Sequence, residues 1–113
     1  MSEYINGYVT AVLELRGEFE GNKKPVIKIK HKTKEVLQYC VDVMGGYING
    51  PYKVGKYSKS LLYVYTLKGA DLDKSHGWIF KNIDEDIIKD WRERHNDYFL
   101  KAKVKIELKL IFK

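Results

Sequence analysis

The chain has 113 residues, of which 44% are hydrophobic, 32% charged and 13% aromatic. These values exclude an intrinsically disordered segment, and the length suits one core, so we expect a single domain over residues 1–113. The net charge is +6 and is unevenly spread, because residues 21–68 carry ten lysines against two acids. Such a local positive field indicates a polyanionic partner.

No apolar run approaches the roughly 20 residues that cross a bilayer, and the first residues lack the order of a signal peptide. We therefore expect a cytoplasmic protein with no membrane partner. The first apolar stretch, residues 4–14, fits both a helix and a strand, because its apolar positions match both periods.

Residues 26–32 alternate clearly and predict a strand, with Ile27 and Ile29 on one face and lysines on the other. Thr33 can cap a following helix over 34–44, which Gly45 and Gly46 would end. Cys40 falls on the apolar stripe of that helix, so we interpret it as a core residue.

The next stretches predict a hairpin: a short strand at 47–49, a turn-rich segment from 50 to 58, and a strand at 61–67. Residues 70–81 are expected to form a short helix plus a loop. Asp84 can cap a further helix that ends near Leu100. Residues 104–110 alternate between apolar and charged side chains, which predicts a closing strand.

Residues 8–19 read YVTAVLELRGEF, residues 25–37 read PVIKIKHKTKEVL, and the stretches GGYI and LYVY follow at 45–48 and 62–65. In order and spacing they resemble one repeat of the LAGLIDADG homing-endonuclease family, over roughly residues 4–68. The resemblance implies an α+β fold with the order αββαββα and a twisted antiparallel sheet. Residues 4–16 would then be the signature helix, and the closing strand would be an addition to the family plan.

In that family the concave face of the sheet lies in the major groove of DNA, and two signature helices pack at the centre of a dimer. The resemblance therefore implies a nucleic-acid partner, most simply duplex DNA, and a homodimer through residues 4–16. The residues expected to contact nucleic acid are the lysines of the strand and of the flanking turns: Lys23, Lys24, Lys28, Lys30, Lys32, Lys53, Lys56 and Lys59. Four tyrosines could add stacking, although the last two are equally suited to an ordinary sheet: Tyr52, Tyr57, Tyr63 and Tyr65.

The family's nucleases place a metal-binding carboxylate at the foot of the signature helix, and here that position is Arg16. A guanidinium cannot ligate a metal ion, so we assign no catalytic residue and no cofactor, and treat Arg16 as a binding residue. The alternative is that Arg16 pairs with Glu14, Glu18 or Glu20. Magnesium would be needed only if another acid, such as Glu18, restored the nuclease site.

No zinc-spaced cysteine or histidine pair and no phosphate-binding glycine loop occurs in the sequence, and His76 is expected to be structural. The leading hypothesis is a catalytically silent nucleic-acid-binding protein, of the kind carried by a mobile element or virus. One alternative is an active endonuclease. Another is an inhibitor that blocks a host nucleic-acid-processing or defence complex.

Overall fold

The computed structural model describes residues 3–56 and 59–111 and has a mixed α+β fold, as expected. Its helices are α1 (Glu3–Arg16), α2 (Lys34–Met44), α3 (Gly69–Asn82), α4 (Glu85–Arg94) and α5 (Asn96–Ile111). Its strands are β1 (Gly17–Glu20), β2 (Val26–His31), β3 (Tyr47–Lys53) and β4 (Leu61–Leu67). They form one antiparallel sheet in the order β1-β2-β4-β3.

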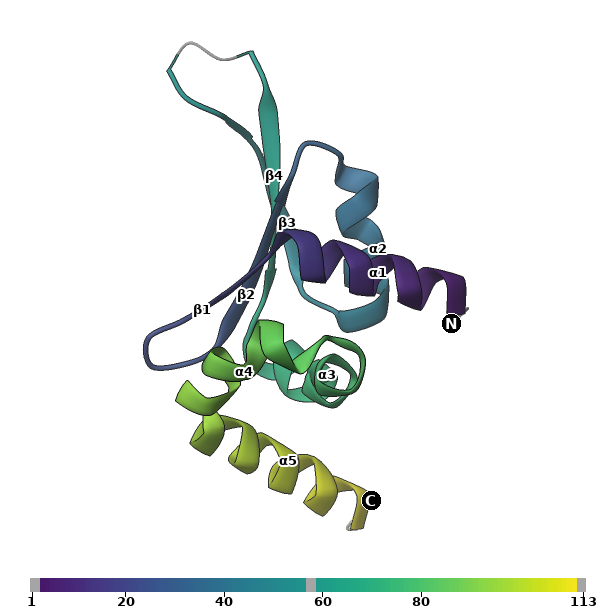
Figure 1. The fold of residues 1–113 in the computed structure, drawn as a ribbon, viewed down its shortest axis with the longest axis vertical. Helices are drawn as coiled ribbons and strands as arrows, with labels where there is room; N and C mark the ends of the chain where they lie inside the picture. The colour runs from purple at the N-terminus through teal and green to yellow at the C-terminus, as the bar shows by residue number, and fades with distance from the viewer. Residues whose placement is uncertain (1–2, 57–58, 112–113) are drawn as a thin grey trace.

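Helices α1 and α2 pack on one face of this sheet, α3 and α4 lie beside them, and α5 packs on α3 and α4 at the end of the molecule, so that the other face of the sheet is uncovered (Figure 1). Alternation along β2 decides which face is which, because Ile27 and Ile29 are fully buried whereas Lys28 and Lys30 point to the uncovered side. Seen nearly edge-on in Figure 1, the sheet bends away from α1 and α2, so its uncovered face is concave. The β3–β4 hairpin extends past the helices along the long axis of the molecule.

The core lies between the sheet and the helices. Val9 and Leu13 of α1 and Leu37 and Cys40 of α2 have no exposed surface, as expected for apolar residues three or four positions apart. Burial raises the pKa of the Cys40 thiol to about 12. The thiol therefore stays protonated at neutral pH, and the full burial of its side chain confirms Cys40 as a core residue.

The ambiguous first stretch is a helix, which ends at Arg16. Gly17 marks the change to β1, because a Cβ atom at this position would collide with the carbonyl oxygen of Leu13. Helix α2 begins and ends as predicted. Thr33 occupies its N-cap position without a capping bond from its side chain, and instead the Thr33 amide donates to Nδ1 of His31 at 2.9 Å.

The predicted closing strand at 104–110 is wrong, because these residues belong to α5. Their alternation is short, and the same segment places Leu100, Val104 and Leu108 on one helical face. The sequence after Gly77 has no glycine or proline that would favour leaving the helix. The fold therefore has no strand in addition to β1–β4 within the described residues.

The other differences lie in the lengths of elements. Residues 70–81 are helical throughout, since α3 spans 69–82 and tolerates Gly77. The helix predicted from Asp84 to Leu100 is divided at His95, whose backbone leaves the helical conformation. Asp84 caps α4 as predicted, with its carboxylate accepting from the amide of Asp86 at 3.0 Å. Strand β3 continues to Lys53, past an irregularity in its pairing between Asn49 and Tyr52.

Candidate nucleic-acid interface

A shallow hollow of about 470 Å³ lies on the uncovered concave face. Strand pairing builds it, because Lys28 lies opposite Thr66, and Val64 lies opposite both Lys30 and Asn49. Paired residues on adjacent strands have their side chains on the same face of a sheet, so these side chains of β2, β3 and β4 share one surface. The hollow is lined by Val26, Lys28, Lys30, Tyr47, Asn49, Tyr52, Val64, Thr66 and Lys68.

The two central lysines are paired with acids of the neighbouring strand. Nζ of Lys28 lies 3.9 Å from a carboxylate oxygen of Glu20, and Nζ of Lys30 lies 3.8 Å from one of Glu18. All four side chains keep a large share of their surface exposed, so each pair contributes about 0–1 kcal/mol and separates easily. The centre of the face therefore presents both signs of charge rather than the purely basic strand face that the sequence predicts. Lys32 is exposed just beyond the end of β2.

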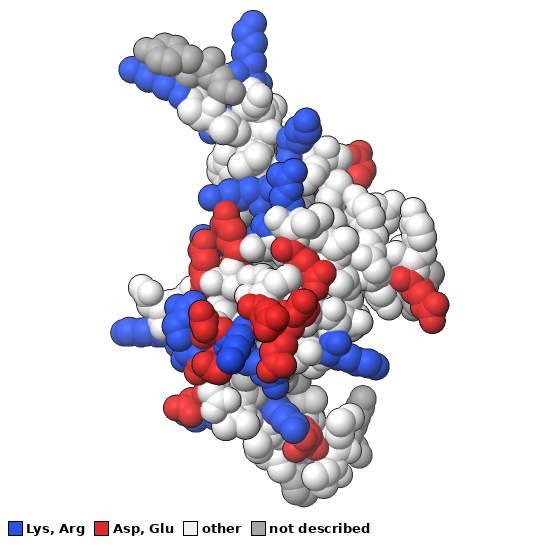
Figure 2. Space-filling view, in the orientation of Figure 1, with Lys and Arg blue, Asp and Glu red and all other residues white. Residues whose placement is uncertain are grey.

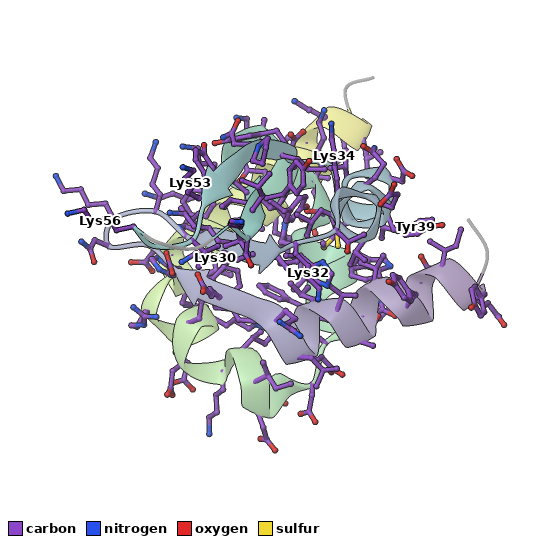
Figure 3. The ribbon with its side chains drawn as sticks, turned by 90° about the horizontal axis from the view of Figure 1, so that it is seen from above. Lys30, Lys32, Lys34, Tyr39, Lys53 and Lys56 are labelled. Atoms are coloured by element: carbon purple, nitrogen blue, oxygen red, sulfur yellow. The ribbon has the colours of Figure 1, made fainter. Side chains whose placement is uncertain are left out.

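The remaining predicted lysines lie at the two ends of the concave face. Lys23 and Lys24 are exposed in the β1–β2 loop, and Lys53, Lys56 and Lys59 are exposed on the β3–β4 hairpin. In Figure 2 basic side chains dominate the hairpin, whereas acidic side chains gather over the middle of the molecule. Figure 3 shows Lys53 and Lys56 projecting on the opposite side of the molecule from Tyr39 of α2. Residues 47–67, which include the hairpin strands, contain three lysines and no acidic residue, so the hairpin end is basic.

Six residues that line the hollow were not expected from the sequence: Val26, Tyr47, Asn49, Val64, Thr66 and Lys68. Lys68 directly follows β4 and continues the alternation of Val64 and Thr66 onto the same face. That alternation was the available signal for Lys68. Asn49 and Tyr47 had no comparable signal, since their face depends on how β3 pairs with β4.

The tyrosines expected to stack with bases divide between the two faces. Tyr52 lines the hollow and is 51% exposed. Tyr65 is fully buried among the core residues, and its hydroxyl donates to the carbonyl oxygen of Gly45 at 2.6 Å. Tyr63 is half-buried against the same core, and Tyr57 lies outside the described residues. Tyr63 and Tyr65 are therefore ordinary sheet residues, and Tyr52 is available for stacking.

Arg16 is exposed at the end of α1, and no ion pair among the described residues involves it. The expected alternative partners have other contacts: a Glu14 carboxylate oxygen accepts from the amide of Asp84 at 2.9 Å, and Glu18 pairs with Lys30. Residues 3–56 and 59–111 contain no group of three acidic, histidine or cysteine side chains placed to hold a metal ion.

The histidines have structural contacts. His95 places Nε2 3.1 Å from the carbonyl oxygen of Gly21, which ties the junction of α4 and α5 to the β1–β2 loop. His76 places Nδ1 2.6 Å from the carbonyl oxygen of Asp73 within its own helix. Since a carbonyl oxygen only accepts, both ring nitrogens named here donate.

Comparison with protein-family models, with curated proteins and with solved structures gave no match to this chain. In the part of the chain that the structure describes, no helix is long and apolar enough to span a bilayer. Function is therefore inferred from the geometry and charge of the chain itself.

Proposed function

We propose that this chain is a catalytically silent nucleic-acid-binding protein with a LAGLIDADG-like fold, which holds duplex DNA against its concave sheet face. The observation that carries the proposal is an uncovered concave sheet with exposed lysines at both of its ends. Lysines in loops contact phosphates and position a duplex without reading its sequence. A sheet between them is placed to enter a groove.

The order α1-β1-β2-α2-β3-β4-α3 supports the LAGLIDADG-like assignment, since it repeats the family's plan. The concave face also agrees with the saddle that such a sheet would form. Helices α4 and α5 are additions to this plan, in place of the expected extra strand.

The different charges of the centre and the ends support a division of roles. The ends present lysines, which suit phosphates, whereas the central hollow presents the Asn49 amide and Lys30, which pairs with Glu18. Base edges in the major groove carry both hydrogen-bond donors and acceptors, and carboxylates, amides and ammonium groups match them. We therefore assign affinity to the ends and any base preference to the centre.

We predict that the protein binds duplex DNA without cutting it. By the resemblance, the exposed Arg16 holds a fixed positive charge where the family's nucleases gather a metal ion, and we expect its guanidinium to contact a phosphate instead. The measurement incubates the wild type, Arg16→Asp and Glu18→Gln with supercoiled plasmid and magnesium or manganese, in parallel with gel-shift binding to duplex DNA and to single-stranded DNA and RNA. We expect retention of duplex DNA with no nicking by the wild type, and weaker binding by Arg16→Asp.

Metal-dependent nicking by the wild type that is lost in Glu18→Gln would overturn the silent assignment and favour an active endonuclease. Preferential binding of single-stranded RNA would move the target away from duplex DNA. Binding that does not weaken with rising salt would contradict phosphate contacts altogether.

We further predict a homodimer through α1. Its outward face presents Tyr4, 84% exposed, and Leu15, 82% exposed, with Tyr8 and Ala11 between them at helical spacing. Light scattering at tens of micromolar should give twice the chain mass, and Tyr8→Asp with Leu15→Asp should give a monomer, because two buried carboxylates would oppose the contact. As a matched control, the same change at two exposed leucines of α5, Leu100 and Leu108, should leave the dimer intact. A monomeric wild type rules the dimer out.

A second candidate function is favoured by α5. Its residues Leu100, Val104, Leu108 and Ile111 form an apolar row that is largely exposed, which suits a protein partner. In this second candidate function, the protein is an inhibitor that binds and blocks a host nucleic-acid-processing or defence complex. Capture of a defined complex that survives nuclease treatment and high salt would favour it over phosphate-driven binding.

A further inference from the structure

A second pocket, of about 340 Å³, lies among the C-terminal helices, and none of its lining residues belongs to the sheet. We propose that it binds a small aromatic anion, a flat ring that carries a single carboxylate. This site is separate from the proposed nucleic-acid face and does not depend on that function. Its size is within the roughly 300–1,000 Å³ usual for small-molecule sites.

Three aromatic rings form one wall of the pocket and hold one another in place. The ring centroids of Phe80 and Phe99 are 4.9 Å apart and nearly perpendicular, at 79°. The His76 ring stacks on Phe99 at 5.7 Å and meets Phe80 edge-on at 5.5 Å. His76 is further fixed by donating to the carbonyl oxygen of Asp73. A flat ring could enter against this wall without reorganising it, and aromatic pairs favour these geometries.

Gly77 of α3 lines a second side of the pocket. It lies inside α3, where glycine is less favourable than alanine, and its backbone does not adopt a left-handed conformation that would require glycine. A Cβ atom at this position would meet no neighbouring atom within 4 Å, so close packing does not explain the glycine either. Open space therefore lies beside Gly77 at the pocket, and we expect a longer side chain at this position to extend into it.

The charge at the pocket is positive. The Arg92 guanidinium carbon lies 4.1 Å from the centroid of the Phe80 ring, and Lys103 of α5 also lines the pocket. No ion pair among the described residues involves either cation, and the residues that line the pocket include no acid. Asn96 adds an amide.

These features select the ligand class. The rings favour a flat apolar body, and Arg92 already lies over one ring face, where a cation and a π-system attract. Two uncompensated cations near an apolar wall favour an anionic group at the edge of that body, since a guanidinium matches a carboxylate with two parallel hydrogen bonds. Neither a neutral ring nor a small aliphatic acid would satisfy both halves of the site.

The test titrates the full chain with 2-naphthoate and follows backbone and side-chain amides by NMR, with 2-naphthamide and acetate as neutral and non-aromatic controls. We expect saturable shifts centred on the Gly77 amide and the Asn96 side chain, and at least about tenfold weaker binding of both controls. Arg92→Gln with Lys103→Gln should reduce naphthoate binding to the level of naphthamide.

Position 77 supplies a matched pair of variants. Gly77→Ala should retain naphthoate binding, because one methyl group leaves the space open, whereas Gly77→Leu should fill the pocket and abolish binding. Both substitutions favour the helix, so loss of fold is not the expected cause. Equal binding by Gly77→Leu and Gly77→Ala would overturn the proposal. So would naphthoate shifts that are centred on the hairpin lysines, because these would indicate general attraction of anions.

Discussion

Replacing Trp91 by alanine is expected to lower the free energy of unfolding by about 3–5 kcal/mol, the usual range for a buried tryptophan. Trp91 is only 2% exposed. Its ring meets Phe19 of β1 at 5.2 Å and Phe99 of α5 at 5.1 Å, and its indole Nε1 donates to the carbonyl oxygen of Glu20 at 2.9 Å. One side chain thus fastens the C-terminal helices to the edge of the sheet.

Urea unfolding followed by circular dichroism and by fluorescence of the remaining Trp78 measures this effect. Trp91→Phe is the matched control, because it keeps most of the apolar contact and removes the indole donor, and we expect it to cost about 1–3 kcal/mol. A loss below about 1 kcal/mol in Trp91→Ala would contradict the tight packing of α4 against the sheet. Two separate transitions in the wild type would show that the C-terminal helices unfold on their own.

Replacing Lys53, Lys56 and Lys59 together by alanine is expected to weaken binding to duplex DNA by about 100-fold at 0.1 M salt. Each phosphate contact releases close to one counterion, so the log–log salt slope should flatten by up to about three units. The hairpin lysines should matter most, because they are exposed at the most basic end of the concave face. Fluorescence anisotropy at several salt concentrations measures both quantities.

The centre of the face supplies the comparison. Replacing Lys28, Lys30 and Lys32 by alanine should weaken binding less than the hairpin change does, because Lys28 and Lys30 already pair with acids. Glu18→Gln with Glu20→Gln should strengthen binding several-fold, because it releases these lysines and removes two charges that repel phosphates. If the central lysines prove the more important set and the glutamine variant is neutral, the affinity lies in the centre and not at the ends. Unchanged circular dichroism controls for the fold in each variant.

Elements with a long and unambiguous hydrophobic period could be predicted from the sequence, whereas elements with a short or ambiguous period could not. Helix α2 and strand β2 were predictable, because each has a regular period, and a double glycine follows α2. The conformation of residues 104–110 was not predictable, because their apolar positions fit both a strand and one face of a helix. Tertiary packing decides between the two, and the local sequence does not show that packing. The division at His95 had no local sequence signal either, and in the folded chain His95 contacts Gly21, which is far away in the sequence.

The candidate site was predictable in composition but not in electrostatics. The exposed lysines can be identified from the turns and from the alternation of β2. Their partners cannot, because the pairing of Glu18 with Lys30 follows from the register of β1 on β2. The aromatic pocket had no sequence signal beyond an isolated helical glycine, since its walls come from three different helices.

The two outer strands of the sheet, β3 and β1, are poorly suited to pair with a strand of another molecule. An open outer strand can recruit a strand from a neighbour and begin a continuous intermolecular sheet. Here β3 is interrupted between Asn49 and Tyr52, contains Pro51 without an amide hydrogen, and ends in Lys53, while the opposite outer strand β1 has only four residues. Both outer strands therefore oppose the addition of a strand from another molecule, so chains at high local concentration are expected to stay separate molecules and not to form β-aggregates.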